Sequence, residues 1–376
     1  MSLRITRLVL REVRLPLVEP FAISSGVTTS RRIFLLELED GDGVSTWSEC
    51  VAGERPNYSA ETIDTAWWAI KEWIGPRVLS GSVPHPSALH GRIGRGIRGH
   101  LMARAAIEMG GWALWAARED MSLSRLLGGT RETVATGISL GIQESPAILA
   151  AKCQSALAAG YRKVKIKIRP GADIEFIAAA RDALGRDAPL MADANSAYTQ
   201  TTAEHLADLD AFGLMMLEQP LAADDLRRHA ALKDTLATPI CLDESITSVE
   251  RTEDMLAFGG GWIVNIKPGR VGGFTAAVGI HDLCRRSGIP VWGGGMLESG
   301  IGRAYNVALA SLPHFTIPGD ISPSARYWEH DIVTPEWTMD TTGMVTVPRD
   351  RPGLGVEIDI DRVENLTVRR KVMRAP

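Results

Sequence analysis

A repeat of strand-like and helix-like segments runs through the chain from residue 133 onwards and constrains its fold more than any other feature. Each unit takes roughly 25 residues, the length of one β-strand, one helix and two short loops. The strand-like segments are residues 134–140, 164–168, 190–192, 215–217, 240–242, 263–266, 290–292 and 315–317. Helical patterns lie between them, as at residues 147–159, 174–184 and 275–286. This alternation predicts a TIM-like (β/α)8 barrel. The competing doubly wound sheet would normally carry a glycine-rich phosphate turn after its first strand, and the sequence has none there.

The ends of the chain follow a different pattern. Residues 1–128 read as an α+β module, with an antiparallel meander that turns at residues 40–43 and helical patterns at residues 60–74 and 101–117. After Gly343 short alternating runs return without a helix to cover them, so we expect this tail to pair back with the amino-terminal module. The predicted domains are residues 1–128 with the tail 343–376, which cap the barrel, and residues 129–342, which form it.

Composition excludes several classes of function. A net charge of -4 and a pI near 6.1 provide no basic face, so we expect neither a nucleic-acid partner nor binding to a membrane. The first residues carry a charge every few positions, which is incompatible with the apolar core of a signal peptide. The four cysteines lie far apart, as expected of buried thiols in a reducing cytoplasm: Cys50, Cys153, Cys241 and Cys284.

Three acids occupy the same position in three consecutive units. Asp193, Glu218 and Asp243 are 25 residues apart, and each follows an apolar run. In a barrel the chemistry gathers at the carboxyl ends of the strands, so these side chains should share one site. Any one of them alone is equally well explained as a helix cap or an ion pair. Three carboxylates without histidine or thiolate favour a hard divalent cation, Mg2+ first and Mn2+ second.

Lysines flank the acids on both sides along the chain. Lys165 and Lys167 lie on the predicted second strand and Lys267 ends the sixth. Strands two and six are opposed in a ring of eight, so we expect lysines to face each other across the mouth of the barrel. A lysine is a poor base at its ordinary pKa of about 10.4, but burial and a second cation lower that pKa. The alternative, solvated surface lysines, fits poorly with the apolar residues between them.

This combination indicates one class of reaction. A carboxylate substrate near the cation would lose its α-proton to one lysine, giving an enediolate that metal and lysine neutralise. The opposite lysine would return a proton, giving racemisation, or a β-substituent would leave, giving dehydration. Asn195 shares a strand face with Asp193 and is a candidate hydrogen-bond donor to the site, with a helix cap as the alternative.

The ordered motifs resemble the enolase superfamily, in its muconate-lactonizing-type subgroup, over nearly the whole chain. Closer similarity is to the o-succinylbenzoate synthase and N-succinylamino acid racemase family. The motifs are residues 165–167 (KIK), 193–195 (DAN), 218–220 (EQP), 243–245 (DES), 265–270 (NIKPGR), 294–304 (GGMLESGIGRA) and 318–322 (PGDIS).

The resemblance implies a role for each candidate residue. It implies that Asp193, Glu218 and Asp243 bind Mg2+, and that Lys167 and Lys267 are the acid/base pair. Further implied roles are support of the enediolate (Lys165), support of the site (Asn195, Glu244), a racemase-associated arginine (Arg270) and contact with the succinyl arm and carboxylate of the substrate (Ser139, Gly295, Met296, Leu297). The alternatives are a surface position for Arg270, a backbone turn for Gly295 and core packing for Met296.

The resemblance also implies that two segments of the amino-terminal module cover the barrel mouth. These are residues 19–25, with Phe21, and residues 51–58, with Tyr58. The stretch at Glu54 and Arg55 is less typical of the family, and lids carry specificity more than chemistry. The reaction class is therefore predicted more firmly than the acyl group or side chain of the substrate.

Several activities share this apparatus. The leading prediction is an enzyme that makes o-succinylbenzoate for menaquinone synthesis, racemises N-succinylamino acids, or does both. A dipeptide epimerase would carry an acidic pair at the last strand, where this chain has Asp320 and Ser322. A muconate cycloisomerase fits the 294–304 motif less well, and an acid-sugar dehydratase would use a late histidine. A catalytically silent metal-binding barrel would need a broken constellation. The family resemblance also implies a homo-oligomer.

Overall fold

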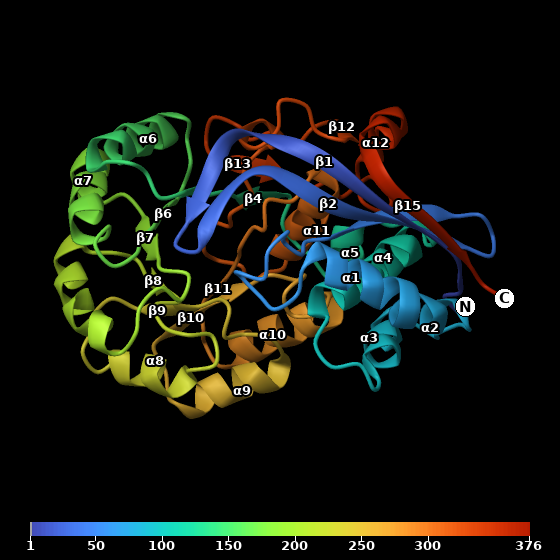
Figure 1. Ribbon diagram of the computed structural model, residues 1–376, viewed down its shortest axis with the longest axis horizontal. Coiled ribbons are helices and arrows are strands. Elements are labelled where there is room, and N and C mark those ends of the chain that lie inside the picture. Colours follow the sequence, from blue (N-terminus) through green and yellow to red (C-terminus); the bar gives the residue numbers. More distant parts are fainter. Residues whose placement is uncertain (1) are drawn as a thin grey trace.

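An antiparallel sheet forms the first layer of the molecule. The computed structural model describes residues 2–376, except the side chain of Glu204. The strand order is β15-β1-β2-β3, with β1 at Ile5–Ile23, β2 at Gly26–Asp40, β3 at Ser45–Cys50 and β15 at Thr367–Arg374. Asp40 Oδ1 accepts bonds of 2.9 Å from the backbone N–H groups of Asp42 and Val44, which closes the predicted turn. The last strand lies beside β1, as predicted for the tail (Figure 1).

Helices cover one face of this sheet. They are α1 (Ile63–Ala69) with its π-helical continuation Ile70–Ile74, α2 (Gly75–Leu79), α3 (Ser87–Gly94), α4 (Leu101–Arg118) and α5 (Leu123–Leu126). The helix α4 is buried on nearly every side. A Cβ at Gly110 would lie 2.7 Å from Leu38 Cδ1, so this glycine allows the helix to approach the sheet. We call β1–β3, β15 and α1–α5 the cap. Within residues 2–376, no helix has the length and hydropathy to cross a membrane.

A curved parallel sheet forms the barrel, and helices alternate with its strands as the repeat predicts. The sheet order is β11-β10-β9-β8-β7-β6-β5. Its strands are β5 (Ile138–Leu140), β6 (Val164–Lys167), β7 (Leu190–Asp193), β8 (Leu217–Glu218), β9 (Ile240–Leu242), β10 (Trp262–Ile266) and β11 (Val291–Gly293). The connecting helices are α6 (Pro146–Ala158), α7 (Ile174–Leu184), the 3-10 helix Thr201–Phe212, α8 (Leu226–Leu232), α9 (Val249–Ala257), α10 (Phe274–Arg286) and α11 (Gly300–Ala310).

The eighth strand differs from the prediction. Residues 315–319 make only isolated bridges, from Phe315 to Val291 and from Gly319 to Thr136. The backbone N–H of Asp320 then donates to Gly293 O at 2.8 Å. Pro318 has no N–H to give to a ladder, which explains why an irregular segment closes the ring instead of a regular strand.

The segments on either side of the barrel also depart from the expected pattern. The predicted first strand divides into β4 (Thr133–Ala135) and β5, and β4 pairs with β13 (Met344–Thr346) of the tail. Short strands β12 (Val333–Thr334) and β14 (Glu357–Ile358) pair with each other. The tail also contains a helix that the alternating pattern did not predict, α12 (Ile360–Leu366), which its N-cap Asp359 starts by accepting from Arg362 N.

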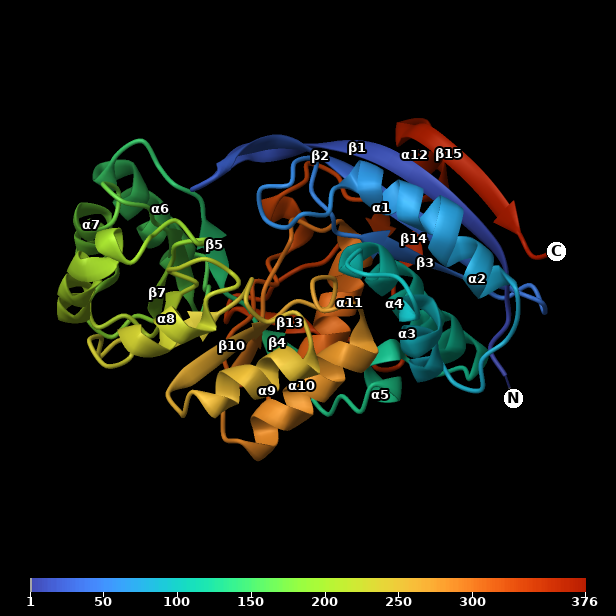
Figure 2. The same cartoon turned by 60° about the horizontal axis from the view of Figure 1, so that its bottom comes forward.

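The tip of the β1–β2 hairpin reaches over the mouth of the barrel (Figure 2). Ile142 N, just after β5, donates to Ala22 O at 2.8 Å. Lys152 on α6 forms a 3.0 Å ion pair with Glu19. The cap therefore contacts the barrel near its first strand as well as beside its last helices.

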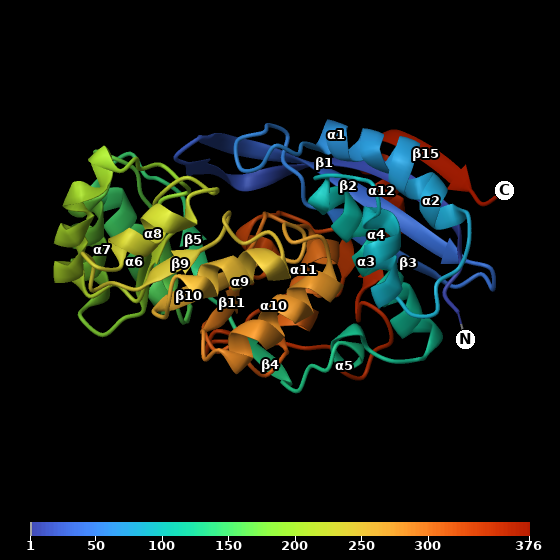
Figure 3. The same ribbon diagram turned by 90° about the horizontal axis from the view of Figure 1, so that it is seen from below.

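Two carboxylates of the cap bind the amino ends of barrel helices. Glu108 on α4 accepts from the backbone of Phe274 (2.7 Å) and Thr275 (3.0 Å), the start of α10. Glu49 on β3 accepts from Ser299 N (3.1 Å) and Gly302 N (3.1 Å), the start of α11. A helix amino terminus offers unpaired N–H groups and a positive dipole end, so both contacts fix the cap on the barrel. Figure 3 shows α3 and α4 beside α10.

The buried Glu49 generates a prediction about pH. Burial raises the pKa of its carboxyl to about 8 from an ordinary value near 4.5. A raised pKa means that the folded state holds a proton that the unfolded chain releases above pH 4.5. The contribution of the Glu49 carboxyl to the unfolding free energy is complete below pH 4.5 and is lost as pH rises to about 8. We expect Glu49→Gln, which keeps the shape without titrating, to remove this loss from the pH curve of the unfolding free energy.

Denaturant unfolding at several pH values between 5 and 8 measures the effect. The matched control is Glu119→Gln, an exposed carboxylate at the end of α4, which should follow the wild type. Parallel curves for wild type and Glu49→Gln would contradict the assignment.

Candidate active site

The three predicted acids meet at the carboxyl ends of neighbouring strands. In the register of the sheet, Lys167 on β6 lies beside Asp193 on β7, which lies beside Glu218 on β8. Asp243 follows β9, the next strand. Each of the three carboxylate residues is at most 1% exposed. The parallel alignment of the strands is what turns positions 25 apart in sequence into one row in space.

An apolar layer fills the barrel beneath this row. It consists of Met191, Met216, Cys241, Ile263 and Trp292. Met191 and Cys241 are each two positions before an acid, so the period of two that points them inward does the same for Asp193 and Asp243. The charges therefore stand on a dry floor, where electrostatic interactions are stronger than in water.

Three lysines reach the acids from the two ends of the row. Lys165 Nζ lies 2.8 Å from Asp193 Oδ2 and 2.6 Å from Glu218 Oε2. Lys167 Nζ lies 2.6 Å from Asp193 Oδ2. Lys267, in the loop after β10, donates to Asp243 Oδ2 at 2.7 Å. The strands β7, β8 and β9 separate β6 from β10, so the lysines approach the row from different sides.

The surroundings give the lysines different proton affinities. Burial lowers the pKa of Lys167, and repulsion from the Lys165 ammonium adds to this against the attraction of Asp193. Burial would also lower the pKa of Lys165, but its carboxylate partners outweigh burial and hold it well above the ordinary value. For Lys267 burial is likewise outweighed, with Tyr58 as the first opposing contact, and its pKa is raised. Lys167 is thus the lysine closest to acting as a base.

Asn195 connects Lys167 with Glu244, the residue that follows Asp243 in the sequence. Asn195 Oδ1 accepts from Lys167 Nζ at 2.7 Å, and its Nδ2 donates to Glu244 Oε1 at 3.1 Å. Burial, with repulsion from Asp193, raises the pKa of Glu244 to about 7. Asn195 therefore makes a hydrogen bond inside the site, and the structure does not place it as a helix cap.

Arg270 is buried, not a surface residue. It is 3% exposed, and its guanidinium contacts the Asp243 carboxylate and donates to Ile246 O at 2.8 Å. Burial lowers the pKa of this guanidinium. Tyr58 from the cap donates at 3.0 Å to Asp243 Oδ1, the same carboxylate oxygen that Arg270 contacts.

The three carboxylates have the chemistry to bind a hard cation. In this structure, lysine and arginine side chains of the protein itself pair with them. Within residues 2–376, no three acidic, histidine or cysteine side chains converge closely enough to hold a metal ion. Lys165 stands between Asp193 and Glu218, and Arg270 and Lys267 hold Asp243. Glu218 Oε2 nevertheless lacks a hydrogen bond of good direction, although Lys165 Nζ is near. Three buried carboxylates suit Mg2+ or Mn2+ once these ion pairs loosen.

The predicted substrate contacts surround one cavity of about 320 Å³, into which Lys167 and Lys267 also project. Its walls include Phe21, Tyr58, Gly295, Met296 and Leu297. Asn57 Nδ2 donates to Ser25 Oγ at 3.1 Å, so the two predicted lid segments touch each other above it. Ser139 is placed differently. It lies buried on β5 beside Lys165, its hydroxyl has no hydrogen-bond partner in the described part of the chain, and it is not part of the cavity wall.

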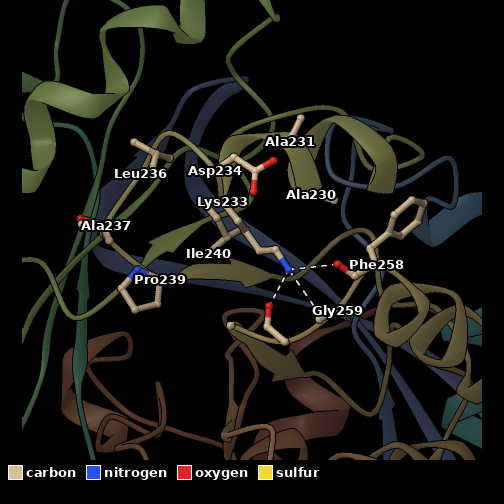
Figure 4. A pocket seen from close by; sticks show the side chains of 13 residues that line it. Ala230, Ala231, Lys233, Asp234, Leu236, Ala237, Pro239, Ile240, Phe258 and Gly259 are labelled. Atoms are coloured by element: carbon tan, nitrogen blue, oxygen red, sulfur yellow. Dashed lines mark hydrogen bonds between the residues drawn. The ribbon is translucent and has the colours of Figure 1, made fainter.

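A second hollow lies between the end of α8 and the starts of β9 and β10 (Figure 4). Its lysine, Lys233, points at the backbone and donates to the carbonyls of Phe258 (3.3 Å) and Gly260 (2.5 Å). This lysine acts as a cap for the turn. The hollow lies at the amino ends of the strands, where barrels carry stability rather than chemistry.

Three polar residues lie next to the site without having been assigned a role at the acid row from the sequence: Lys163, Asn265 and Asp320. Asn265 Nδ2 donates to Glu218 Oε1 at 2.7 Å. Asp320 lies 3.2 Å from Lys163 Nζ and 3.4 Å from Lys165 Nζ. The period of two that pairs Lys165 with Lys167 also places Lys163 on that face, and the same rule pairs Asn265 with Lys267. Asp320 stands in the 318–322 motif, but its pairing with Lys163 and Lys165 had no signal in the periodicity, because the segment that carries it is not a regular strand.

The fold and this arrangement define a class of barrel enzymes with a cap domain. The sequence matches the family described as "Enolase C-terminal domain-like" over residues 148–363. It matches "Mandelate racemase / muconate lactonizing enzyme, N-terminal domain" over residues 5–128. The chain therefore belongs to the enolase superfamily, in the group of mandelate racemase and muconate lactonizing enzyme, which confirms the resemblance seen in its motifs.

Individual relatives are similar over their whole length. An o-succinylbenzoate synthase of Geobacillus stearothermophilus is 46% identical over 372 residues, 99% of this chain and 98% of the relative. An N-succinylamino acid racemase of Thermus thermophilus is 43% identical over 99% of this chain and 100% of its own. The crystal structure of an enolase superfamily member from Listeria innocua superposes with a TM-score of 0.94 at 36% identity, covering 100% of both chains.

The buried ion pairs generate a prediction about stability. Asp193→Asn removes the carboxylate that Lys165 and Lys167 share and leaves two buried ammonium groups short of a partner. Breaking a buried pair in this way typically costs about 3–5 kcal/mol, and we expect that loss of unfolding free energy in metal-free protein. Denaturant titration measures it.

The control is Asp187→Asn, an exposed aspartate shortly before the same strand. Equal losses for the two variants would show that the carboxylate row does not depend on its lysines.

Proposed function

We propose that this protein uses Mg2+ to abstract the proton α to a carboxylate, as an o-succinylbenzoate synthase, an N-succinylamino acid racemase, or both. The observation that carries the proposal is the pair Lys167 and Lys267, which enter one cavity from two sides of a buried carboxylate row. Relatives more than 40% identical over the whole chain carry these two names.

The charge pattern suggests how the protein's own residues divide the work. Lys167, whose pKa is lowered by burial, takes the α-proton as a neutral amine, and Asn195 orients its Nζ through the 2.7 Å hydrogen bond. Lys267, whose pKa is raised, carries a proton that it can give back. Lys165 stays charged and offsets the negative charge of the enediolate.

Asp193, Glu218 and Asp243 would hold the Mg2+ ion, with Mn2+ as the alternative. When bound, the ion would supply positive charge beside the substrate carboxylate and so acidify its α-proton. For Asp243 this requires that the contacts of Arg270 and Lys267 change when the ion enters. Tyr58 and the lid segments would exclude water from the cavity.

Both proposed activities begin with the same proton transfer. If Lys267 gives a proton to the opposite face of the α-carbon, the product is the other enantiomer of an N-succinylamino acid. If a β-hydroxyl leaves with a proton as water, the electron pair of the enediolate forms the new double bond. Because the first step is shared, one cavity is compatible with both proposed activities.

The alternatives have less support. A dipeptide epimerase would need acids free to bind the substrate amino group at residues 320 and 322. Here Asp320 pairs with Lys163 and Lys165 inside the barrel, and Ser322 Oγ donates to Gly137 O at 3.3 Å. A silent barrel is disfavoured because the acid row and both lysines are intact. We further propose a cytoplasmic homo-oligomer acting on small carboxylates; the four buried free cysteines accord with a reducing compartment.

The lysines generate a prediction about stereochemistry. Lys167→Met and Lys267→Met should each lower racemisation of an N-succinylamino acid by about 10²–10⁴-fold, because general acid-base catalysis contributes that much. Each variant should still exchange the α-proton of one enantiomer with D2O, and the two variants should act on opposite enantiomers. Proton NMR in D2O measures the exchange.

Lys371→Met is the control, since this lysine is exposed on β15 and does not line the cavity. Retained exchange of the same enantiomer in both active-site variants would place both lysines on one face and contradict the proposal.

Metal removal gives a second prediction. Treatment with EDTA followed by dialysis should abolish turnover of an N-succinylamino acid and of the cyclohexadiene precursor of o-succinylbenzoate. Addition of Mg2+ or Mn2+ should restore it, because the donor set consists of carboxylates. Full activity in metal-free protein would show that the acid row serves only to balance the lysines.

A further inference from the structure

A buried arginine in the wall of the active-site cavity forms no direct ion pair with any described residue. Arg31 lies on β2, is 7% exposed, and lines the same cavity as Lys167 and Lys267. No acidic group within residues 2–376 comes within 4.0 Å of its guanidinium, and its Nε makes no hydrogen bond. Among the described residues, its side chain makes a single hydrogen bond, a long one of 3.4 Å from Nη2 to Val51 O. A buried guanidinium normally has partners, because removing it from water is costly.

Nearby carboxylates are occupied by other groups. Glu49 accepts from Ser299 Oγ at 2.6 Å and from two backbone N–H groups. Glu49 attracts the Arg31 charge through space, but it makes no ion pair with the guanidinium among the described residues.

Two other acids attract Arg31 through space but form no ion pair with it among the described residues. Glu298 Oε1 accepts from Asn306 Nδ2 at 2.7 Å, and Arg303 Nη2 lies 3.5 Å from its Oε2. Glu54 is exposed on the lid segment 51–58. The guanidinium therefore brings to the cavity wall a positive charge that has no direct ion pair within the described residues.

We propose that Arg31 is a specificity-determining residue that binds a second carboxylate of the substrate, at the end of its acyl arm. The inference rests on the proposed function, in which the first carboxylate lies at the lysines and the acid row. The preferred substrates are then dicarboxylates with an anionic acyl arm, such as a succinyl group, rather than acetyl analogues. A carboxylate suits this position because the planar guanidinium presents paired donors that match its two oxygens.

Binding of two probes tests the proposal. N-succinylglycine carries the second carboxylate, and N-acetylglycine lacks it. Isothermal titration calorimetry with Mg2+ in the buffer should show that wild type prefers the succinyl probe. Arg31→Met should weaken binding of N-succinylglycine by about 10- to 100-fold, the usual effect of losing a charged hydrogen-bonded pair, and should change N-acetylglycine by less than about 2-fold.

Two further variants keep the result decisive. Arg31→Lys retains a charge without the paired donors and should lie between wild type and Arg31→Met. If Arg31→Met does not fold, as judged by circular dichroism, the change of preference in Arg31→Lys decides the question. Arg14→Met removes an exposed arginine that faces Arg32 on the adjacent strand, and it should leave both affinities unchanged.

The outcomes separate this inference from the proposed function. If Arg31→Met weakens the binding of both probes equally, or does not weaken the binding of N-succinylglycine, the role of Arg31 is overturned. Exchange of the α-protons of each probe with D2O, followed by NMR, reports proton abstraction independently. If wild type binds the succinyl probe preferentially through Arg31 and yet exchanges no α-proton, that result would uphold the arginine site and refute the proposed reaction.

Discussion

Charge balance inside a dry barrel is the constraint on which the rest of the structure depends. Asp193, Glu218 and Asp243 stand on an apolar floor, and each would be unstable there as an isolated anion. Lys165 and its neighbours supply the opposite charge at distances under 3 Å. The same contacts that make burial tolerable also set the proton affinities of the lysines. Stability and chemistry therefore share one network, in which a divalent cation would compete with the ammonium and guanidinium groups for the carboxylates.

The cap completes this network from outside the barrel. Glu49 and Glu108 fix the cap to the amino ends of α11 and α10. Both glutamates precede the three acids of the row by many residues in the sequence. Tyr58 then reaches Asp243, and the hairpin tip lies against the start of the barrel. The cap supplies Tyr58 and Arg31 to the cavity wall, while the barrel supplies the lysines. The proposed reaction and the proposed choice of substrate therefore depend on different parts of the chain.

The sequence predicted those features that follow from strand periodicity. The equal spacing of Asp193, Glu218 and Asp243 sufficed to place them together, because parallel strands align their carboxyl ends. Periodicity carries no information about contacts between segments distant in sequence. Arg270 on Asp243, Asp320 beneath Lys165 and the irregular closure at Pro318 all depend on tertiary packing, and Arg31 stands out only when its missing partner is seen in three dimensions.

The central claim is that two lysines serve one α-carbon beside a cation held by the acid row. A crystal structure of the protein with Mg2+ and N-succinylglycine examines it most directly. We predict one ion bound by Asp193, Glu218 and Asp243, with Lys167 and Lys267 on opposite faces of the glycine α-carbon. An ion bound elsewhere, or both lysines on the same face, would contradict the account.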